Sequence, residues 1–315
     1  MSNVSRQARP AIFIVGPDYH LGDLLWLTTV LASYRIQLKP SEIVVSLPDR
    51  EISHILVGNP TIDRLIFRNP QAQPVTEWSN AEVHDLRPLA IARVMIREWR
   101  RRLPWLYYRD LWLEPRGQWL ATYLGLGALA TFRPVLALNE ADRVSAPRFT
   151  SPYVVLAPHS GSYSLPLVGG AWRKIKEWDQ ERWVELVRKL ADAGIQSVTL
   201  GAANQGHIRG SIPVLELPIR HAAVVIEKAE ALITGESGLW FVAAALETPF
   251  IIVPWWLPRG IDWPAPMGVP YRLIRRHSDS VEDVLLAEQA LTAEVRHADP
   301  IRPNNRTPTS IGAPQ

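Results

Sequence analysis

Short apolar runs alternate with amphipathic segments along most of the chain. In the first half, runs typical of buried strands occupy residues 11–15, 43–47, 64–67 and 83–86, and helical spacing occupies 23–34, 51–57 and 87–126. In the second half the pattern predicts strands at 153–157, 197–200, 231–234 and 250–253, and helices at 181–193, 219–228, 238–246 and 281–295. Strands and helices that alternate in this way form parallel sheets covered by helices. The pattern therefore predicts an α/β protein with two Rossmann-like domains.

A polar stretch separates the two alternating series. Residues 139–150 include Pro147 and suit an interdomain linker, and the tail after Asp299 is rich in Pro, Asn and Thr. Ligands of such folds bind outside the carboxyl ends of the strands, so we expect a binding cleft between the two sheets. The expected division is an N-terminal domain at 1–145, a C-terminal domain at 146–299 and a disordered tail at 300–315.

The composition narrows the class of protein. With 47% hydrophobic and 21% charged residues, the 315-residue chain has enough apolar material for folded cores. The formal net charge of +3 is too small by itself to indicate a protein that binds nucleic acid. The lack of cysteine excludes disulfide frameworks, thiolate metal sites and thiol catalysis.

The apolar segments predict neither export nor a membrane span. The run at 11–16 is too short for the core of a signal peptide. The run at 238–257 is long enough to imitate a membrane helix, but Glu247, Pro249 and Pro254 interrupt it. We therefore expect a cytoplasmic protein.

Gly22 and Asp23 lie in the turn between the first predicted strand and its helix, close to His20. A carboxylate at this position faces the predicted cleft, where it is well placed to accept a proton from an incoming hydroxyl group. An acidic residue at the start of a helix also serves as a cap. The position alone leaves both roles open for Asp23, with Gly22 and His20 beside it.

A hydroxyl-rich turn follows the first strand of the second half. Residues 158–162 offer backbone N–H groups and the hydroxyls of Ser160 and Ser162 to an anion. Lys174 and Lys176 follow closely, although the chain has only five lysines, and an ammonium group binds diphosphates well. The alternatives are a phosphate site and a solvated basic loop.

A second turn in this half, at 234–239, places Glu236, Ser237 and Gly238 before a helix. Glycine allows a ligand to approach the backbone closely, and the start of a helix attracts phosphate. Glu236 suits hydrogen bonds to sugar hydroxyls. An ordinary helix start explains the same residues.

Taken in order, these segments resemble glycosyltransferase family 9, the ADP-heptose:lipopolysaccharide heptosyltransferases. The resemblance extends from about residue 11 to residue 255. Its second half matches the Lys-x-Trp segment and the signature Asp-Ser-Gly-Leu-x-His…Ala-Ala-Leu-x-x-Pro of that family. The matching segments are GDLLWLT at 22–28, GNPTID at 58–63, KEWD at 176–179, ESGL at 236–239, AAAL at 243–246 and TP at 248–249.

The resemblance implies a GT-B fold, in which two Rossmann-like domains face each other across a cleft. It implies an acceptor in the first domain and a nucleotide-diphosphate sugar in the second. Asp23 maps onto the general base of an inverting displacement, and Lys176 maps onto the phosphate ligand. The implied donor turn is formed by Glu236, Ser237 and Gly238.

The resemblance also implies a reaction without metal or other cofactor, and the sequence has no HExxH or close Asp-x-Asp pair. The implied activity is transfer of heptose or another hexose-like sugar to a saccharide hydroxyl, in the synthesis of lipopolysaccharide or another cell-surface glycan.

The chain departs from the family signature at two places. Glu236 stands where the signature has Asp, and Trp240-Phe241 stands where it has x-His, which predicts a more apolar donor pocket. Three other functions stay open. They are a catalytically silent GT-B module that binds a nucleotide or glycan, a sugar-nucleotide epimerase, and a transferase that acts on modified DNA.

A basic and aromatic segment precedes the linker. Residues 87–119 contain eight Arg and four of the 13 Trp residues of the chain. Three interpretations of Arg97–Trp119 are open: peripheral contact with anionic lipid at the inner face of the inner membrane, contact with nucleic acid, and a helix pair packed on the sheet. The small net charge makes nucleic acid the least favoured of the three.

Overall fold

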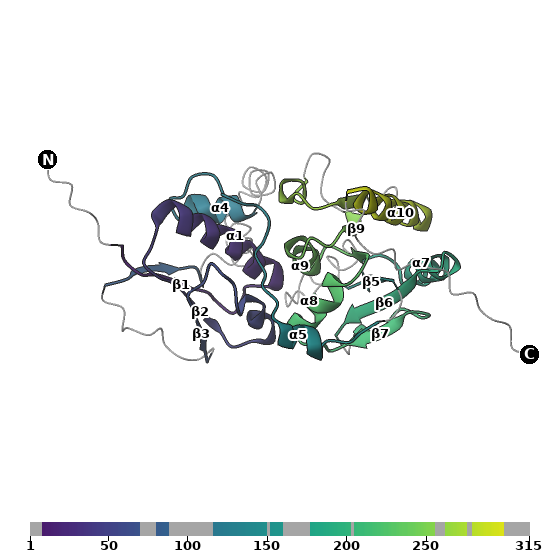
Figure 1. Ribbon diagram of the computed structural model, residues 1–315, viewed down its shortest axis with the longest axis horizontal. Helices are drawn as coiled ribbons and strands as arrows, with labels where there is room; N and C mark the ends of the chain where they lie inside the picture. Colours follow the sequence, from purple (N-terminus) through teal and green to yellow (C-terminus); the bar gives the residue numbers. More distant parts are fainter. Residues whose placement is uncertain are drawn as a thin grey trace, which may run out of the picture.

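The computed structural model describes residues 8–69, 80–87, 116–149, 152–159, 177–202, 205–255, 262–275 and 279–298. Two α/β halves lie side by side, and each is built on its own parallel sheet (Figure 1). This arrangement confirms the prediction of two Rossmann-like units, while the domain boundary near residue 145 stays a prediction.

The first half contains a four-stranded sheet. Its elements are β1 (Ala11–Ile14), α1 (Leu21–Leu38), β2 (Ile43–Pro48), the 3₁₀ helix η1 (Glu51–Leu56), β3 (Arg64–Arg68), β4 (Glu82–Asp85) and α4 (Arg116–Tyr123). The strands are parallel, in the order β3-β2-β1-β4. β1 and β2 form the middle of the sheet and are almost wholly buried, so their apolar runs predicted them well.

The second half contains a six-stranded sheet, again parallel, in the order β10-β9-β8-β5-β6-β7. Its strands are β5 (Tyr153–Ala157), β6 (Gln196–Gly201), β7 (Ile212–Leu215), β8 (Ala231–Thr234), β9 (Phe250–Trp255) and β10 (Tyr271–Arg275). Its helices are α7 (Gln180–Asp192), α8 (Ile219–Glu227), α9 (Leu239–Ala245), the 3₁₀ helix η4 (Ala265–Met267) and α10 (Val281–Ala298). The segment 238–257 thus divides into a helix and a strand, as expected, and none of the described helices combines the length and apolar character needed to cross a bilayer.

The pattern missed four elements, which are β7, β10, α5 and the short η4, and mistook the type of another. β7 and β10 lie at the two edges of their sheet and are half-buried, so they lack a continuous apolar run. The polar linker contains α5 (Glu140–Ser145), in which the Asn139 side chain accepts from the Asp142 N–H at 2.9 Å. The predicted helix at 51–57 is the 3₁₀ helix η1, a form that is frequent in short segments.

One apolar core runs through both halves. It includes Leu25 and Trp26 of α1 together with Val225 of α8 and Phe241 of α9. A second cluster lies in the C-terminal half, where α7 and α10 cover the other face of the larger sheet. Helices α1, η1, α8 and α9 therefore form the contact between the two sheets, and α1 begins beside α9 (Figure 1).

Candidate functional site

The central strand of the first sheet leads into the predicted catalytic turn. The order β3-β2-β1-β4 places β2 and β4 on opposite sides of β1, so the carboxyl end of β1 is the switch point at which such folds bind ligands. The Tyr19 hydroxyl donates to the Leu86 carbonyl at 3.0 Å and ties this turn to the end of β4. Burial and the nearby charge of Asp23 raise the pKa of Tyr19 well above its usual range, so this hydroxyl stays protonated.

Asp23 is the third residue of α1, and only 8% of its surface is exposed. Its Oδ2 atom accepts from the backbone N–H of His20 at 3.0 Å. The carboxylate therefore stabilises the first turn of α1, which is the helix-capping role left open by the sequence. This contact also fixes the orientation of the carboxylate at the switch point.

Three arginines surround the same turn, and the sequence analysis did not single out two of them, Arg50 and Arg68. Arg50 donates to the carbonyls of Pro17 and Tyr19, and Arg68 donates to the Val15 carbonyl at 2.8 Å. Arg87 follows β4. Burial, followed by repulsion from Arg87, lowers the pKa of Arg68, which places the two guanidinium groups in one electrostatic neighbourhood.

Asp85 balances only part of this positive charge. The Arg87 guanidinium binds the carboxylate of Asp85 through two contacts of 2.8 and 2.6 Å. These hydrogen bonds hold the pKa of Asp85 below its usual range, so Asp85 stays charged. The sequence could have indicated Arg50 and Arg68 as site residues through their positions at strand ends. Arg68 is the last residue of β3, and Arg50 lies shortly after β2.

The predicted donor turn lies at the corresponding switch point of the second sheet, between β5 and β8. The Thr234 hydroxyl donates to the Ala157 carbonyl at 3.0 Å and lies 2.9 Å from the Ser237 hydroxyl oxygen. Ser237 also accepts from the Leu239 N–H at 3.3 Å, so it supports the turn before α9, whose N-cap residue is Gly238. Glu236 is buried, with 6% of its surface exposed.

His159 lies beside this turn, because it follows β5 directly. Its Nδ1 atom is 3.8 Å from Oε1 of Glu177, and the two side chains are 18% and 17% exposed. The predicted donor side therefore also contains an imidazole and a carboxylate that lie close to each other.

The two turns meet across the boundary between the halves. A Cβ atom added to Gly22 would lie 3.8 Å from the Cα atom of Gly238, and a Cβ added to Gly238 would lie 3.0 Å from the backbone nitrogen of Gly22. Asp23 directly follows Gly22, and Glu236 lies two residues before Gly238. The structure thus brings the predicted acceptor-side and donor-side residues into one place.

The comparisons with known proteins give similarity to one protein family. A family model described as glycosyltransferase family 9 (heptosyltransferase) matches residues 128–253. Lipopolysaccharide heptosyltransferase 2 of Escherichia coli is 27% identical over 121 residues, which are 34% of this chain and 34% of that protein. These partial matches make the chain similar to glycosyltransferase family 9. The alignment spans about a third of the length of that curated relative.

Solved structures of family 9 proteins share the whole fold. The family 9 glycosyltransferase of Veillonella parvula has a TM-score of 0.67 at 15% identity, covering 91% of this chain and 97% of that one. The E. coli ADP-heptose LPS heptosyltransferase II has a TM-score of 0.62 at 18% identity, covering 91% and 99%. These likenesses confirm the GT-B fold that the resemblance implied.

One expectation about the family 9 signature is wrong. Trp240 and Phe241, which stand where the family has x-His, do not line a more apolar donor pocket: they are only 0% and 3% exposed. Phe241 packs against Trp26 of α1 with ring centroids 5.4 Å apart, and Trp240 packs against Phe250. Both rings are buried in the core that joins the halves.

Several predicted family 9 residues lie outside the described residues. These are Ser160, Ser162, Lys176 and most of the segment Arg97–Trp119. At the end of that segment, Trp119 is partly buried and stacks on Tyr123 in α4, which contacts α1, so this end packs on the fold. Trp178 of the Lys-x-Trp segment donates to the Asp279 carbonyl at 3.1 Å and has a structural role.

No group of three or more His, Asp or Glu side chains in the described ranges is arranged to hold a metal ion. Metal independence stays a prediction from the family resemblance.

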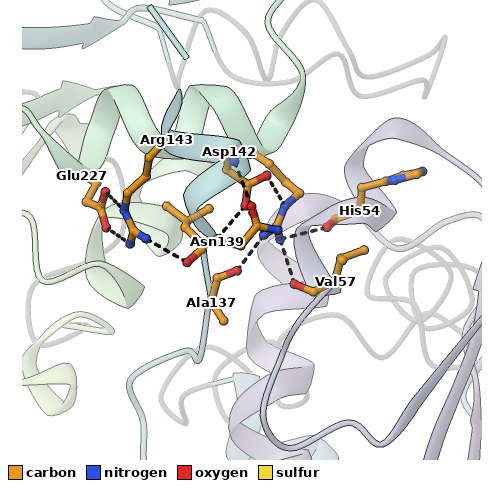
Figure 2. A network of polar contacts seen from close by, with 9 residues as sticks. His54, Val57, Ala137, Asn139, Asp142, Arg143 and Glu227 are labelled. Carbon is orange, nitrogen blue, oxygen red and sulfur yellow. Dashed lines mark hydrogen bonds and ion pairs between the residues drawn. The ribbon is translucent and has the colours of Figure 1, made fainter. Parts of the chain in front are cut away.

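The sequence also missed a polar contact between the halves, which we name the Arg220 clamp. Arg220 of α8 is 9% exposed; it donates to Asp142 Oδ1 at 2.9 Å and to the carbonyls of Val57 and Ala137 at 2.8 and 2.9 Å (Figure 2). The hydrogen bonds from Arg220 are the main reason why the pKa of Asp142 lies below its usual range. The clamp therefore holds a charged pair at the base of the two halves.

Proposed function

We propose that the chain is a glycosyltransferase that moves a sugar from a nucleotide-diphosphate donor to a saccharide hydroxyl group, with inversion and without a metal ion. The observation that carries this proposal is the contact between the turn of Asp23 and the turn of Glu236, made through Gly22 and Gly238. The match of residues 128–253 to the family 9 model supports it. We further propose heptose as the first donor sugar to test and lipopolysaccharide synthesis as the pathway.

In the proposed reaction Asp23 is the general base. It accepts the proton of the acceptor hydroxyl while the acceptor oxygen attacks the anomeric carbon. The bond between that carbon and the phosphate oxygen breaks, its electron pair leaves with the diphosphate, and the new bond forms on the opposite face. The contact from the His20 N–H keeps one oxygen of Asp23 in place, which favours a fixed direction of proton transfer.

The donor side is proposed to hold the sugar and the leaving group. Glu236 at the end of β8 is the proposed acceptor of hydrogen bonds from sugar hydroxyls. Lys176, with Ser160 and Ser162 in the turn after β5, is proposed to bind the diphosphate, whose negative charge increases as the bond breaks. Ser237 supports the turn through its contact with the Leu239 N–H.

The acceptor side indicates an anionic substrate. Arg50, Arg68 and Arg87 lie around the turn before Asp23, and Asp85 balances only one of them. Guanidinium groups bind carboxylate and phosphate well. We therefore propose an acceptor saccharide that carries such groups, and a location at the inner face of the inner membrane, with Arg97–Trp119 contacting anionic lipid.

The proposal is tested with Asp23→Asn, which keeps the size of the side chain and removes the base. We expect transfer to fall by about 10²–10⁴-fold, because general base catalysis contributes that much. The donor dissociation constant, measured by calorimetry with ADP-heptose and then with GDP-, UDP- and dTDP-sugars, should stay within about threefold. Lys176→Ala is the complementary variant and should mainly weaken donor binding.

The control is the wild-type chain with each donor and with no acceptor. Donor binding without transfer to any saccharide would favour the silent GT-B module, and conversion of the donor without an acceptor would favour an epimerase. Full transfer by the Asp23→Asn variant would remove Asp23 from the mechanism.

A further inference from the structure

The first turn of α1 and the start of α9 approach each other more closely than side chains permit. A Cβ atom on Gly238 would lie 2.9 Å from Cβ of Leu21 and 3.0 Å from the backbone nitrogen of Gly22. Contacts of Cβ atoms in proteins are ordinary only from about 3.4 Å outwards. Glycine at 238 is therefore required by this approach and not by its backbone angles, since its φ is −64°.

The reverse contact involves the aromatic ring that replaces the histidine of the family. A Cβ atom on Gly22 would lie 3.0 Å from Cε2 and 3.2 Å from Cδ2 of Phe241. Phe241 is held on its other sides by Trp26 at 5.4 Å and by Trp240, whose ring is stacked on it at 3.6 Å. Because the interior is closely packed, this ring has little room to move.

We propose that Gly22, Gly238 and Phe241 form a positioning contact that sets the distance between Asp23 and the donor turn. The inference rests on the proposed function. Gly22 is the residue immediately before Asp23, so any displacement of Gly22 moves the base. Gly238 follows Glu236 and Ser237, so the donor turn moves with the other side of the contact.

The displacement that a methyl group would cause at this contact is large enough to affect catalysis. A methyl group at Gly22 or Gly238 needs a few tenths of an ångström more than the contact offers. A misplacement of about 1 Å at a reacting group costs on the order of 100-fold in rate. The contact therefore affects the rate of transfer by setting the position of Asp23, although neither glycine touches the reacting atoms.

The test is a double-mutant cycle of Gly22→Ala and Phe241→Leu. Gly22→Ala alone should lower kcat about tenfold or more while the donor dissociation constant changes by less than about threefold, because the donor site keeps its own residues. Leucine has no atom at the Cε2 position, so Phe241→Leu makes room for the new methyl group. The double variant should therefore recover most of the lost kcat.

Leu190→Ala is the control for a general loss of stability. Leu190 of α7 is wholly buried in the second apolar cluster, which contains no residue of α1 or α9. Its truncation leaves a cavity away from the proposed contact. We expect it to lower thermal stability and to leave kcat within about twofold of wild type.

A distance measurement separates this inference from the proposed function. The chain has no cysteine, so spin labels can be placed at Ile36→Cys and Leu286→Cys, which are 61% and 62% exposed in the first and second halves. Gly22→Ala should shift or broaden the distance distribution, Phe241→Leu in the same chain should reverse this, and Leu190→Ala should not change it.

Unchanged kcat and unchanged distances in Gly22→Ala would overturn the inference, as would equal loss of kcat in Gly22→Ala and Leu190→Ala. A wild-type chain that transfers no sugar, but whose distances respond as expected, would overturn the proposed function and support the contact.

Discussion

Arg220 and Phe241 both join the two halves of the molecule, but by different kinds of interaction. The Arg220 clamp is a buried ion pair with directed hydrogen bonds to Asp142 and to the carbonyls of Val57 and Ala137. The contact of Phe241 with Gly22 is apolar and has no directed bond. Hydrogen bonds and charge fix one arrangement of the halves, while an apolar contact limits only how close they come.

This difference indicates that the two contacts have different roles in the structure. The clamp lies at the base of the halves, where α5 and α8 meet η1, and anchors their orientation (Figure 2). The apolar contact lies at the carboxyl ends of the sheets, next to Asp23. An anchor at the base and an apolar contact that sets the closest approach near the reacting groups suit a site that must bring two substrates together.

The largest expected effect comes from breaking the clamp. Arg220→Met leaves the Asp142 carboxylate, whose side chain is 11% exposed, without its cation, and we expect the free energy of unfolding to fall by about 3–5 kcal/mol. Urea denaturation measures this. In the matched control, Arg220→Met combined with Asp142→Leu, most of the loss should be recovered, since a buried ion pair replaced by apolar residues is often neutral. A single variant as stable as wild type would show that the clamp is not an anchor.

The contribution of Asp142 to the free energy of unfolding also depends on pH, and the effect expected here is smaller. The folded pKa of Asp142 lies below its unfolded value, mainly because Arg220 donates to it, so its contribution is complete above about pH 4. The contribution is lost as the pH falls through the folded pKa. Unfolding followed between pH 5 and 2 should therefore show a shallower acid limb in the double variant than in wild type. The Phe241→Leu variant, which changes no charge, should keep the acid limb of wild type.

The smallest effect is expected at the outer edge of the clamp. Arg143 donates to both carboxylate oxygens of Glu227 at 3.0 and 2.7 Å, but the side chains are 34% and 21% exposed. Solvent and salt weaken such a pair, so Glu227→Gln should cost about 0.5 kcal/mol or less. A loss as large as that of Arg220→Met would mean that the whole network, and not Arg220, anchors the halves.

Local sequence patterns predicted most of the fold and the positions of the candidate turns. The strands at 153–157 and 231–234 match β5 and β8 residue for residue, because strands buried on both faces carry unbroken apolar runs. β7 and β10 were missed because edge strands are half exposed. The turns that carry Asp23 and Glu236 could be located because they follow central strands whose apolar runs are recognisable in the sequence, while the roles of both residues stay predictions.

The sequence by itself therefore determined two parallel sheets, their central strands and the turns at which substrates are proposed to bind. Only the tertiary structure decided that Phe241 packs on Gly22, that Gly238 touches the same turn, and that Arg220 binds Asp142. These residues are separated by 78 or more positions along the chain. Periodicity reports which face of a helix or strand is buried, but the neighbour on the other side depends on how the elements pack in space.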